Sequence, residues 1–405
     1  RDGLLSHFAV HFSPIYYLLL PFFFIFPSPV TLLMGQAAII ASGLIPLYLI
    51  CKRHKLSNAA VILFSLCYVL LPSMANGCFF FLHENKFLTP LILWLAFALE
   101  KNKWIPSVIF TLLLLAVKED APVYAAVLGL YFIVSRRNIS KGALVFVLSI
   151  IYFITVSYFM SKYGLGTMSY RYDNFIYDGS GSLFTVIKAV ILNPIYTVHE
   201  AFDEEKIKFI LQMLVPLAFM PLMIKKPSRI ILLIPFILLN LMSDYTYQHN
   251  INFQYTYGSA AFLFYLMILN YQDMKPGFRC KVLAVAATSS IFMFMCNTYY
   301  RTSGYESYKT DKNSGAIDII DDALELVPDD SSVAATTFLV ASLYDHREVY
   351  EFESTNHRDE VEYIVLDLRI SSDDFSVDDY LNNPIYETVE NKPGYIAIFR
   401  NTTVE

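Results

Sequence analysis

Three short polar motifs lie in the mainly apolar part of the sequence before residue 311, and each lies at the edge of an apolar run. They are His11-Phe12-Ser13-Pro14, His83-Glu84-Asn85-Lys86 and Lys118-Glu119-Asp120. Ionisable side chains are costly to place at membrane level, so their presence there indicates a functional site. Together the motifs supply carboxylates, imidazoles and an ammonium group, which are the residue types used for proton transfer and for binding polar ligands.

These residues suggest a specific division of chemistry. The carboxylates are the candidate catalytic residues, as general bases, divalent-metal ligands or partners for sugar hydroxyls: Glu84, Glu119 and Asp120. Three other residues are the candidate substrate-binding groups: His11, His83 and Lys118. An ammonium group would suit a phosphate as a point charge. A divalent metal ion is the one cofactor suggested, although no strict ligand spacing such as His-Glu-x-x-His occurs.

Each motif also has a plainer interpretation. His11 could lie in the lipid headgroup region as an amphipathic side chain. His83-Glu84 could form a solvated turn, and Lys118-Glu119-Asp120 a tight hairpin whose charges pair with each other. The chemical interpretation requires the three motifs to meet in space, whereas scattered motifs would favour a non-catalytic scaffold.

The composition places these motifs in a polytopic integral membrane protein. Of 405 residues, 56% are apolar and 16% charged, and the mean hydropathy is +0.46. Charged residues make up about 25% of ordinary soluble proteins. The net charge of −6 comes mainly from the last hundred or so residues, so it indicates no nucleic-acid partner. All five cysteines fall in or beside apolar segments, so we expect no disulfide framework.

Apolar runs bounded by charged residues predict an all-α bundle of about ten transmembrane spans. The predicted spans cover residues 30–51, 58–76, 87–99, 104–117, 120–134, 142–161, 207–224, 229–242, 255–270 and 282–298. The preceding segment, 14–26, is apolar but too short to cross, and we interpret it as an interfacial or re-entrant helix. The alternative is that it forms half of a helical hairpin, which would reverse the orientation.

The connecting loops alternate in charge. Every second loop carries Lys and Arg, as at 52–55, 101–103, 136–141, 225–229 and 275–281. Under the positive-inside rule these loops face the cytoplasm. The intervening loops, 1–29, 77–86, 162–206 and 243–254, then face outward, as do the turn Lys118-Glu119-Asp120 and the C-terminal end of the chain. The long loop 162–206 contains a predicted amphipathic helix from Leu183 to Tyr196.

Residues 311–405 predict a small soluble α/β domain on the extracytoplasmic side, following a transmembrane domain over residues 1–310. Apolar residues from Ile317 to Val327 recur at helical spacing. The predicted strands are 332–335, 348–352 and 362–367, followed by a hairpin over 385–389 and 395–400. No glycine-rich phosphate loop accompanies them.

As a set, these motifs resemble the domain of unknown function 2079 family of predicted membrane proteins. The resemblance is carried by His11-Phe12-Ser13-Pro14, Leu32-Leu33 with Gln36, Pro46-Leu47-Tyr48, His83-Glu84 and Lys118-Glu119-Asp120. In the C-terminal part it is carried by Val327-Pro328, Ser332 to Ala335, Arg347 to Tyr350 and Tyr363 to Asp367.

That family is similar in layout to the GT-C class of membrane glycosyltransferases. The likeness implies transfer of a sugar from a polyprenyl-phosphate donor to a glycan, lipid or protein acceptor at the outer face of a prokaryotic plasma membrane. GT-C enzymes are expected to carry an acidic residue in the first outer loop. The sequence begins inside the corresponding loop, where Asp2 is the one carboxylate before His11, so we expect the first span and the main catalytic Asp to be missing.

Two other functions remain open at this level. A transporter or flippase would use the outer charges as a gate or proton relay, and it predicts ionisable residues near the middle of several spans. A non-catalytic membrane scaffold would use its C-terminal domain to bind a partner.

Overall fold

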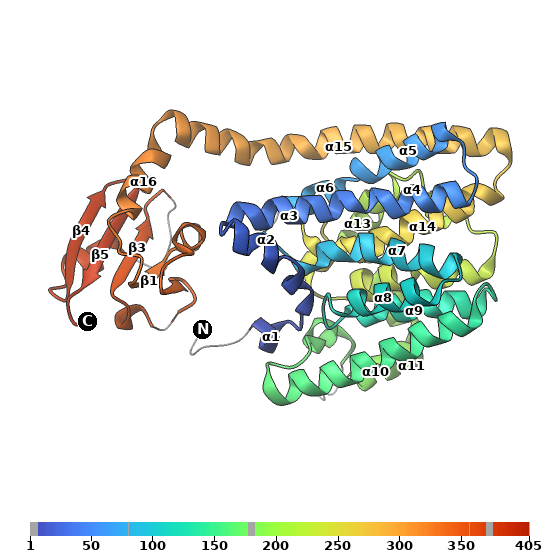
Figure 1. Ribbon diagram of the computed structural model, residues 1–405, viewed down its shortest axis with the longest axis horizontal. Helices are drawn as coiled ribbons and strands as arrows, with labels where there is room; N and C mark the ends of the chain where they lie inside the picture. Colours follow the sequence, from blue (N-terminus) through green and yellow to red (C-terminus); the bar gives the residue numbers. More distant parts are fainter. Residues whose placement is uncertain (1–6, 80, 177–182, 356, 370–375, 405) are drawn as a thin grey trace. The chain divides into compact units, whose positions relative to one another are not determined.

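The computed structural model describes residues 7–79, 81–176, 183–355, 357–369 and 376–404. Two compact units make up the chain, a helical unit over His7–Tyr300 and a C-terminal unit that begins at Arg301 (Figure 1). The boundary expected at residue 310 falls inside helix α15, which runs from Pro276 to Asn313.

The helical unit begins with short elements and continues with longer ones. Its first helices are α1 (His7–Val10), α2 (Leu20–Ile25), α3 (Pro29–Ser42), α4 (Leu44–Arg53), α5 (Asn58–Val69), α6 (Pro72–Cys78), α7 (Leu88–Glu100) and α8 (Trp104–Leu115). The later helices are α9 (Ala121–Val134), α10 (Ile139–Tyr163), α11 (Leu183–Leu192), α12 (Pro194–Ala201), α13 (Glu204–Leu214), α14 (Tyr257–Asp273) and α15. Helices α11 and α12 cover the predicted amphipathic segment and meet at Pro194.

The expectation of ten membrane spans is not supported. Three helical stretches in the described part of the chain are long and apolar enough to cross a bilayer: Pro29–Arg53, Ile139–Tyr163 and Pro276–Asn297. The pair α5 and α6, bent by 47° at a short break, would make a fourth. Large apolar side chains on the long helices are exposed, among them Ile154 and Phe292 at 61% and 65%. The chain is therefore membrane-embedded, with fewer full spans than predicted.

Helix length explains the difference. The apolar helices α7, α8 and α9 have 13, 12 and 14 residues. Such helices are about 20 Å long, whereas the hydrocarbon core is about 30 Å thick. The predicted spans over 207–224 and 229–242 are broken further. Ala218 and Phe219 have left-handed backbone angles, and residues 227–241 form a 3-10 segment followed by a π-helical segment.

The segment predicted to be interfacial is also short. It forms a 3-10 turn over Pro14–Leu18 and the six-residue helix α2. The side chains of Phe22 and Phe24 are 63% and 88% exposed. Exposed aromatic residues on a helix too short to cross fit a position at the membrane interface.

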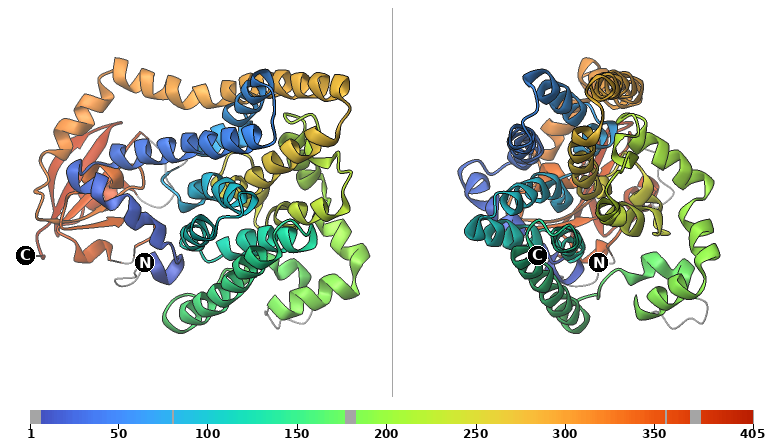
Figure 2. Two further views of the ribbon diagram at one scale, coloured as in Figure 1. Left: turned by 45° about the vertical axis from the view of Figure 1, so that its right-hand side comes forward. Right: turned by 90° about the vertical axis from the view of Figure 1, so that its right-hand side faces the viewer.

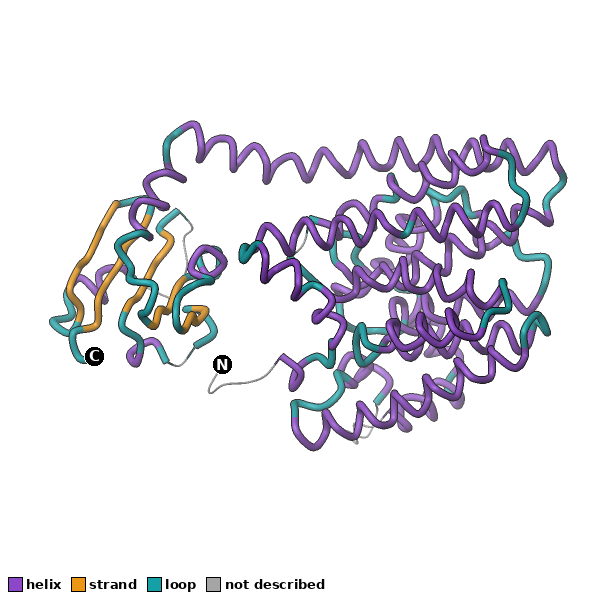
Figure 3. Tube along the Cα trace, viewed as in Figure 1, coloured by secondary structure: helices purple, strands orange, loops and turns teal. Residues whose placement is uncertain are grey.

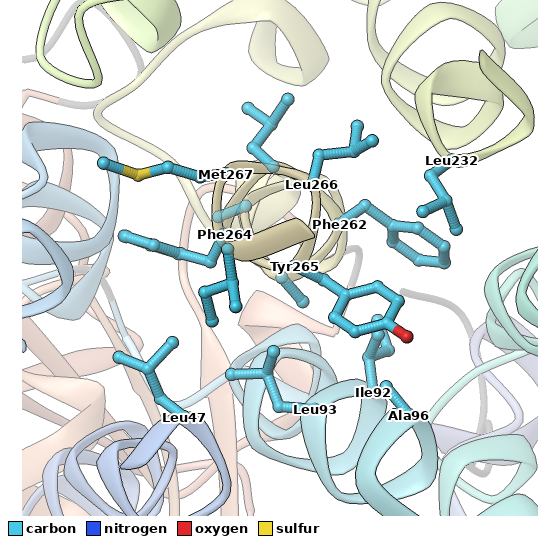
Figure 4. Close-up of a cluster of buried hydrophobic side chains, with 14 of the residues drawn as sticks. Leu47, Ile92, Leu93, Ala96, Leu232, Phe262, Phe264, Tyr265, Leu266 and Met267 are labelled. Atoms are coloured by element: carbon cyan, nitrogen blue, oxygen red, sulfur yellow. The ribbon is translucent and has the colours of Figure 1, made fainter. Parts of the chain in front are cut away.

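Helix α14 forms the centre of the helical unit. All its residues from Tyr257 to Tyr271 are buried. Figure 4 shows its Phe262, Phe264 and Met267 side chains with Leu93 of α7 and Leu232 nearby. A helix that is apolar on every side is expected inside a bundle. Here it provides the scaffold from which the shorter helices position the polar motifs.

Helices α9 and α10 lie side by side at unusually close range (Figure 2). A Cβ atom built on Gly129 would lie 2.7 Å from the carbonyl oxygen of Gly142, and one on Gly142 would lie 2.7 Å from that of Gly129. Only glycine allows the two backbones to approach this closely. Their contact fixes α9, which begins directly after Asp120.

The loops rich in Lys and Arg lie together at one end of the helical unit. Arg53 and Arg137 both approach Glu100, at 3.1 and 3.6 Å. Arg229 pairs with Asp273 at 2.6 Å. Helix α7 runs from the motif at Glu84 to Glu100 at this basic end. The charge alternation along the sequence thus corresponds to two ends of one helical unit.

The C-terminal unit is a five-stranded sheet with helices (Figure 3). Its elements are α16 (Ala316–Leu324), β1 (Ser332–Ala335), β2 (Glu348–Glu351), β3 (Tyr363–Asp367), α17 (Val377–Leu381), β4 (Tyr386–Lys392) and β5 (Ile396–Asn401). The strand order is β2-β1-β3-β5-β4, with β1 parallel to β2 and β3, and β5 antiparallel to β3 and β4. The predicted strands and the final hairpin are confirmed. Gly394, at φ 78°, allows the turn between β4 and β5.

Candidate functional site

The three polar motifs meet at the end of the helical unit remote from Glu100. His11 Nδ1 lies 2.9 Å from Glu119 Oε1, which joins the first motif to the third. Lys118 Nζ lies 3.1 Å from Glu84 Oε1, which joins the third motif to the second. The motifs are therefore neither scattered nor separate solvated turns.

Backbone contacts hold the His11 segment against the loop between α8 and α9. The amide of Ile15 donates to the carbonyl oxygen of Ala116 at 2.9 Å. The amide of Phe12 donates to Glu119 Oε2 at 3.1 Å, so one segment occupies both oxygens of this carboxylate. Burial raises the pKa of Glu119, but His11 and Lys118 outweigh that effect and hold it below its ordinary value. Glu119 is therefore a positioned carboxylate anion.

Glu84 and Lys118 form a buried ion pair. Each side chain is 1% exposed. Glu84 Oε2 also accepts a hydrogen bond from the Tyr16 hydroxyl at 2.7 Å and lies 3.3 Å from His83 Nδ1. Burial raises the pKa of Glu84, but the charge of Lys118 and the other partners lower it to about 2. Buried charges persist when they are paired and hydrogen-bonded in this way.

Asp120 differs from the other two carboxylates. In the described part of the chain, its buried Oδ1 atom has neither a hydrogen-bond partner nor an ion pair, whereas Glu84 Oε1 lies 3.1 Å from Lys118. Burial raises the pKa of Asp120, and neighbouring Glu119 adds to this effect, although Lys118 and Arg171 act in the opposite direction. A carboxylate with a raised pKa and an unused oxygen is a suitable general base.

A cavity of about 270 Å³ adjoins this carboxylate. Its polar lining includes Lys118, Glu119, Asp120 and Arg171. Its apolar lining includes Val123, Phe153, Val186, Leu238 and Leu239. The other predicted residues lie behind the described lining: His11 contacts Glu119, Glu84 contacts Lys118, and His83 contacts Glu84. An apolar chamber with one charged end suits an amphiphilic ligand.

Arg171 and two tyrosines belong to the site but were not predicted. The guanidinium carbon of Arg171 lies 4.4 Å from the ring centre of Tyr245 and 5.3 Å from that of Tyr255. Lys118 Nζ lies 5.6 Å from the same Tyr255 ring. Arg171 is the only arginine in the loop 162–206, and this feature of the sequence could have identified it as a site residue. No comparable feature marks Tyr245 and Tyr255, since the chain has 29 tyrosines.

Lys86 braces the second motif. Its side chain is fully buried, and Nζ donates to Gln36 Oε1 at 2.8 Å and to the carbonyl oxygen of Phe81 at 2.7 Å. Burial lowers the pKa of Lys86 to about 8. These bonds anchor the turn before Glu84 to helix α3, which carries Gln36. Lys86 thus has a positioning role.

Whether this site could bind a divalent metal ion depends on which carboxylate oxygens are available as ligands. Across the described ranges, no three His, Cys, Asp or Glu side chains are grouped as a metal site. Glu84 and Glu119 already hold cationic or donor partners, which leaves Asp120 as the oxygen ligand with spare capacity. A metal would need water or substrate oxygens to complete its coordination, as Mg²⁺ commonly does. Asp2, the first carboxylate of the chain, lies outside the described residues.

Comparison with protein families decides the relationship suggested by these motifs. A match to the predicted membrane protein family DUF2079 covers residues 2–396. The chain belongs to the DUF2079 family. The match covers both the helical unit and nearly all of the C-terminal unit of this DUF2079 protein. The search of curated proteins gave no match, and neither did the search of solved structures.

Proposed function

We propose that this DUF2079 protein is a GT-C-type glycosyltransferase of a prokaryotic plasma membrane. It transfers a sugar from a polyprenyl-phosphate donor to a glycan, lipid or protein acceptor on the extracytoplasmic face, where its C-terminal unit also lies. The observation that carries this proposal is the unpartnered, buried Oδ1 of Asp120 beside a mainly apolar cavity whose other charged groups include Lys118 and Arg171.

The cavity residues fit the parts of the reaction. Asp120 takes the proton of an acceptor hydroxyl, whose oxygen then bonds to the anomeric carbon of the sugar. The bond from that carbon to the donor phosphate breaks, and the electron pair leaves with the phosphate oxygen. Lys118 and Arg171 offset the charge that develops on that phosphate. Apolar residues such as Leu238 and Leu239 accept the polyprenyl chain.

The remaining motif residues act by positioning. His11 and the Phe12 amide hold Glu119 in place. Glu84 fixes Lys118, and His83 lies beside Glu84. A group held by such partners keeps its geometry when the substrate enters, which lowers the cost of reaching the transition state.

Asp120→Asn tests the proposed base. The protein would be reconstituted in vesicles with a polyprenyl-phosphate hexose labelled in the sugar, and transfer to water or to an added acceptor would be measured. Because a positioned general base contributes about 10²- to 10⁴-fold, we expect at least a hundredfold loss of rate. Asp173→Asn, in an exposed neighbour of Arg171, should keep the wild-type rate. Adding EDTA to remove divalent metal ions tests whether transfer requires one.

Three outcomes separate the candidate functions. Transfer that survives in Asp120→Asn contradicts the assigned base. Binding of polyprenyl phosphate without sugar transfer, together with its movement between leaflets, would favour a flippase. Neither binding nor transfer, in wild-type protein that melts cooperatively, would favour the scaffold.

A further inference from the structure

A second polar cavity, of about 450 Å³, lies at the basic end of the helical unit. Its lining consists of Arg53, His54, Leu99, Glu100, Phe132 and Arg137. These residues come from the ends of α4 and α7, the end of α9 and the loop that follows α9. Among the described residues, the cavity shares no lining residue with the site around Asp120.

Glu100 is the hub of this cavity. Its side chain is 4% exposed, and its oxygens lie 3.1 Å from Arg53 Nε and 2.9 Å from His54 Nε2. The hydroxyl of Tyr265, on the central helix α14, donates to Glu100 Oε1 at 2.7 Å. Burial raises the pKa of Glu100, but His54, Tyr265 and Arg137 outweigh that effect and hold the pKa below its ordinary value. The carboxylate is thus a fixed anion.

Arg137 is bound more loosely than Arg53. Its Nη1 atom lies 3.6 Å from Glu100 Oε1, beyond hydrogen-bond range, whereas Arg53 donates from Nε to Glu100 Oε2 at 3.1 Å and from Nη2 to the Glu100 carbonyl oxygen. A guanidinium group carries five N–H donors. Two guanidinium groups against one carboxylate leave the cavity with a net positive charge. The carboxylate orients the arginines without consuming their capacity to bind a further anion.

From this geometry we infer that the cavity binds a phosphate group between Arg53 and Arg137. Paired guanidinium groups match the oxygens of phosphate in bidentate fashion. The phosphate belongs either to an anionic lipid headgroup or to a small soluble phosphate compound. Basic pockets between membrane helices commonly hold lipid headgroups, and Phe132 and Leu99 give this one an apolar wall.

The test uses the whole protein in nanodiscs, with two probes. Inorganic phosphate is titrated while the melting temperature is followed, and phosphatidylglycerol is exchanged for phosphatidylcholine while bound lipid is counted by native mass spectrometry. Arg137→Gln should weaken binding of the effective probe by about tenfold or more, since it removes charge-assisted hydrogen bonds to the phosphate. Glu100→Gln should tighten it, because the negative charge that repels a bound phosphate is removed.

Arg136→Gln is the matched control, because this exposed neighbour has the same charge and is absent from the cavity lining. If inorganic phosphate raises the melting temperature and Arg137→Gln reduces this rise, the ligand is a soluble phosphate compound. A response to phosphatidylglycerol alone supports a lipid headgroup. Equal binding by Arg137→Gln and Arg136→Gln in both arms overturns the inference. If Glu100→Gln fails to fold, the Arg137→Gln variant still tests the inference. The melting temperature of Arg137→Gln without ligand shows whether that variant folds.

Discussion

Glu84 and Lys118 contribute buried charges to this site, and burying a charge costs free energy. Both charges lie away from water, so each must be satisfied by the other, and Glu84 also accepts a hydrogen bond from the Tyr16 hydroxyl. A purely structural bundle would be better served by apolar residues at these positions. The retention of a buried pair next to Asp120 is therefore more easily explained by chemistry than by stability.

His83 gives a testable pH dependence. Burial lowers the pKa of His83 to about 3, with Glu84 opposing and Lys118 adding to the effect, against 6.5 for a free histidine. Below pH 6.5 the unfolded chain binds a proton here that the folded chain does not bind until about pH 3. The contribution of His83 to the free energy of unfolding therefore falls as the pH is lowered through that window.

Removing this imidazole should flatten the pH dependence. Between about pH 7 and about pH 5, the melting temperature of His83→Gln should fall less than that of the wild type, by roughly 2–4 °C. Thermal melting in detergent at each pH measures this. His199→Gln serves as control, since the His199 side chain is 79% exposed and should leave the profile unchanged. Parallel profiles for His83→Gln and wild type would refute the assignment.

At the scale of elements, the contact between α9 and α10 positions the loop that carries Lys118 to Asp120. Gly129→Val would place side-chain atoms where the carbonyl oxygen of Gly142 and the amide of Phe146 now lie, 2.7 and 2.9 Å from the Cβ position. The helices would have to separate, which should destabilise the protein by about 1–3 kcal/mol. Thermal melting of the purified variant checks this expectation.

Gly277→Ala is the matched comparison for that substitution. Gly277 is also helical, but no atom of the described residues lies within 4 Å of its Cβ position. Alanine there should be neutral or slightly stabilising, because it favours helix more than glycine does. If both variants melt together, the close approach of α9 and α10 is not important for stability.

At the scale of the whole molecule, the C-terminal unit has its own two-sided core. Val333, Val365 and Ile398 pack on one face of the sheet, whereas Ile364 and Phe399 pack on the other. This follows from the alternation of side chains along a strand. We expect a fragment of residues 314–405 to fold alone as a soluble domain, with a cooperative melting transition by circular dichroism. Val365→Asp should abolish that transition, and an unfolded wild-type fragment would contradict the prediction.

The sequence by itself determined the features that depend on local composition and period. It established the membrane class, the positions of apolar helical segments, the strands around Tyr363 to Asp367, and the polar motifs at Glu84 and Lys118. The composition of a segment indicates whether lipid or water surrounds it, and the spacing of its apolar side chains indicates helix or strand. Neither depends on distant parts of the chain.

Only the tertiary structure decided how many segments can cross the bilayer and which polar residues meet. His11 and Glu119 are 108 residues apart and bond at 2.9 Å. Arg171 reaches the cavity from a loop whose sequence indicated no partner. Apolarity alone cannot distinguish a buried short helix from a span, because both exclude water. Which side chains converge depends on helix ends and packing, which no local period encodes.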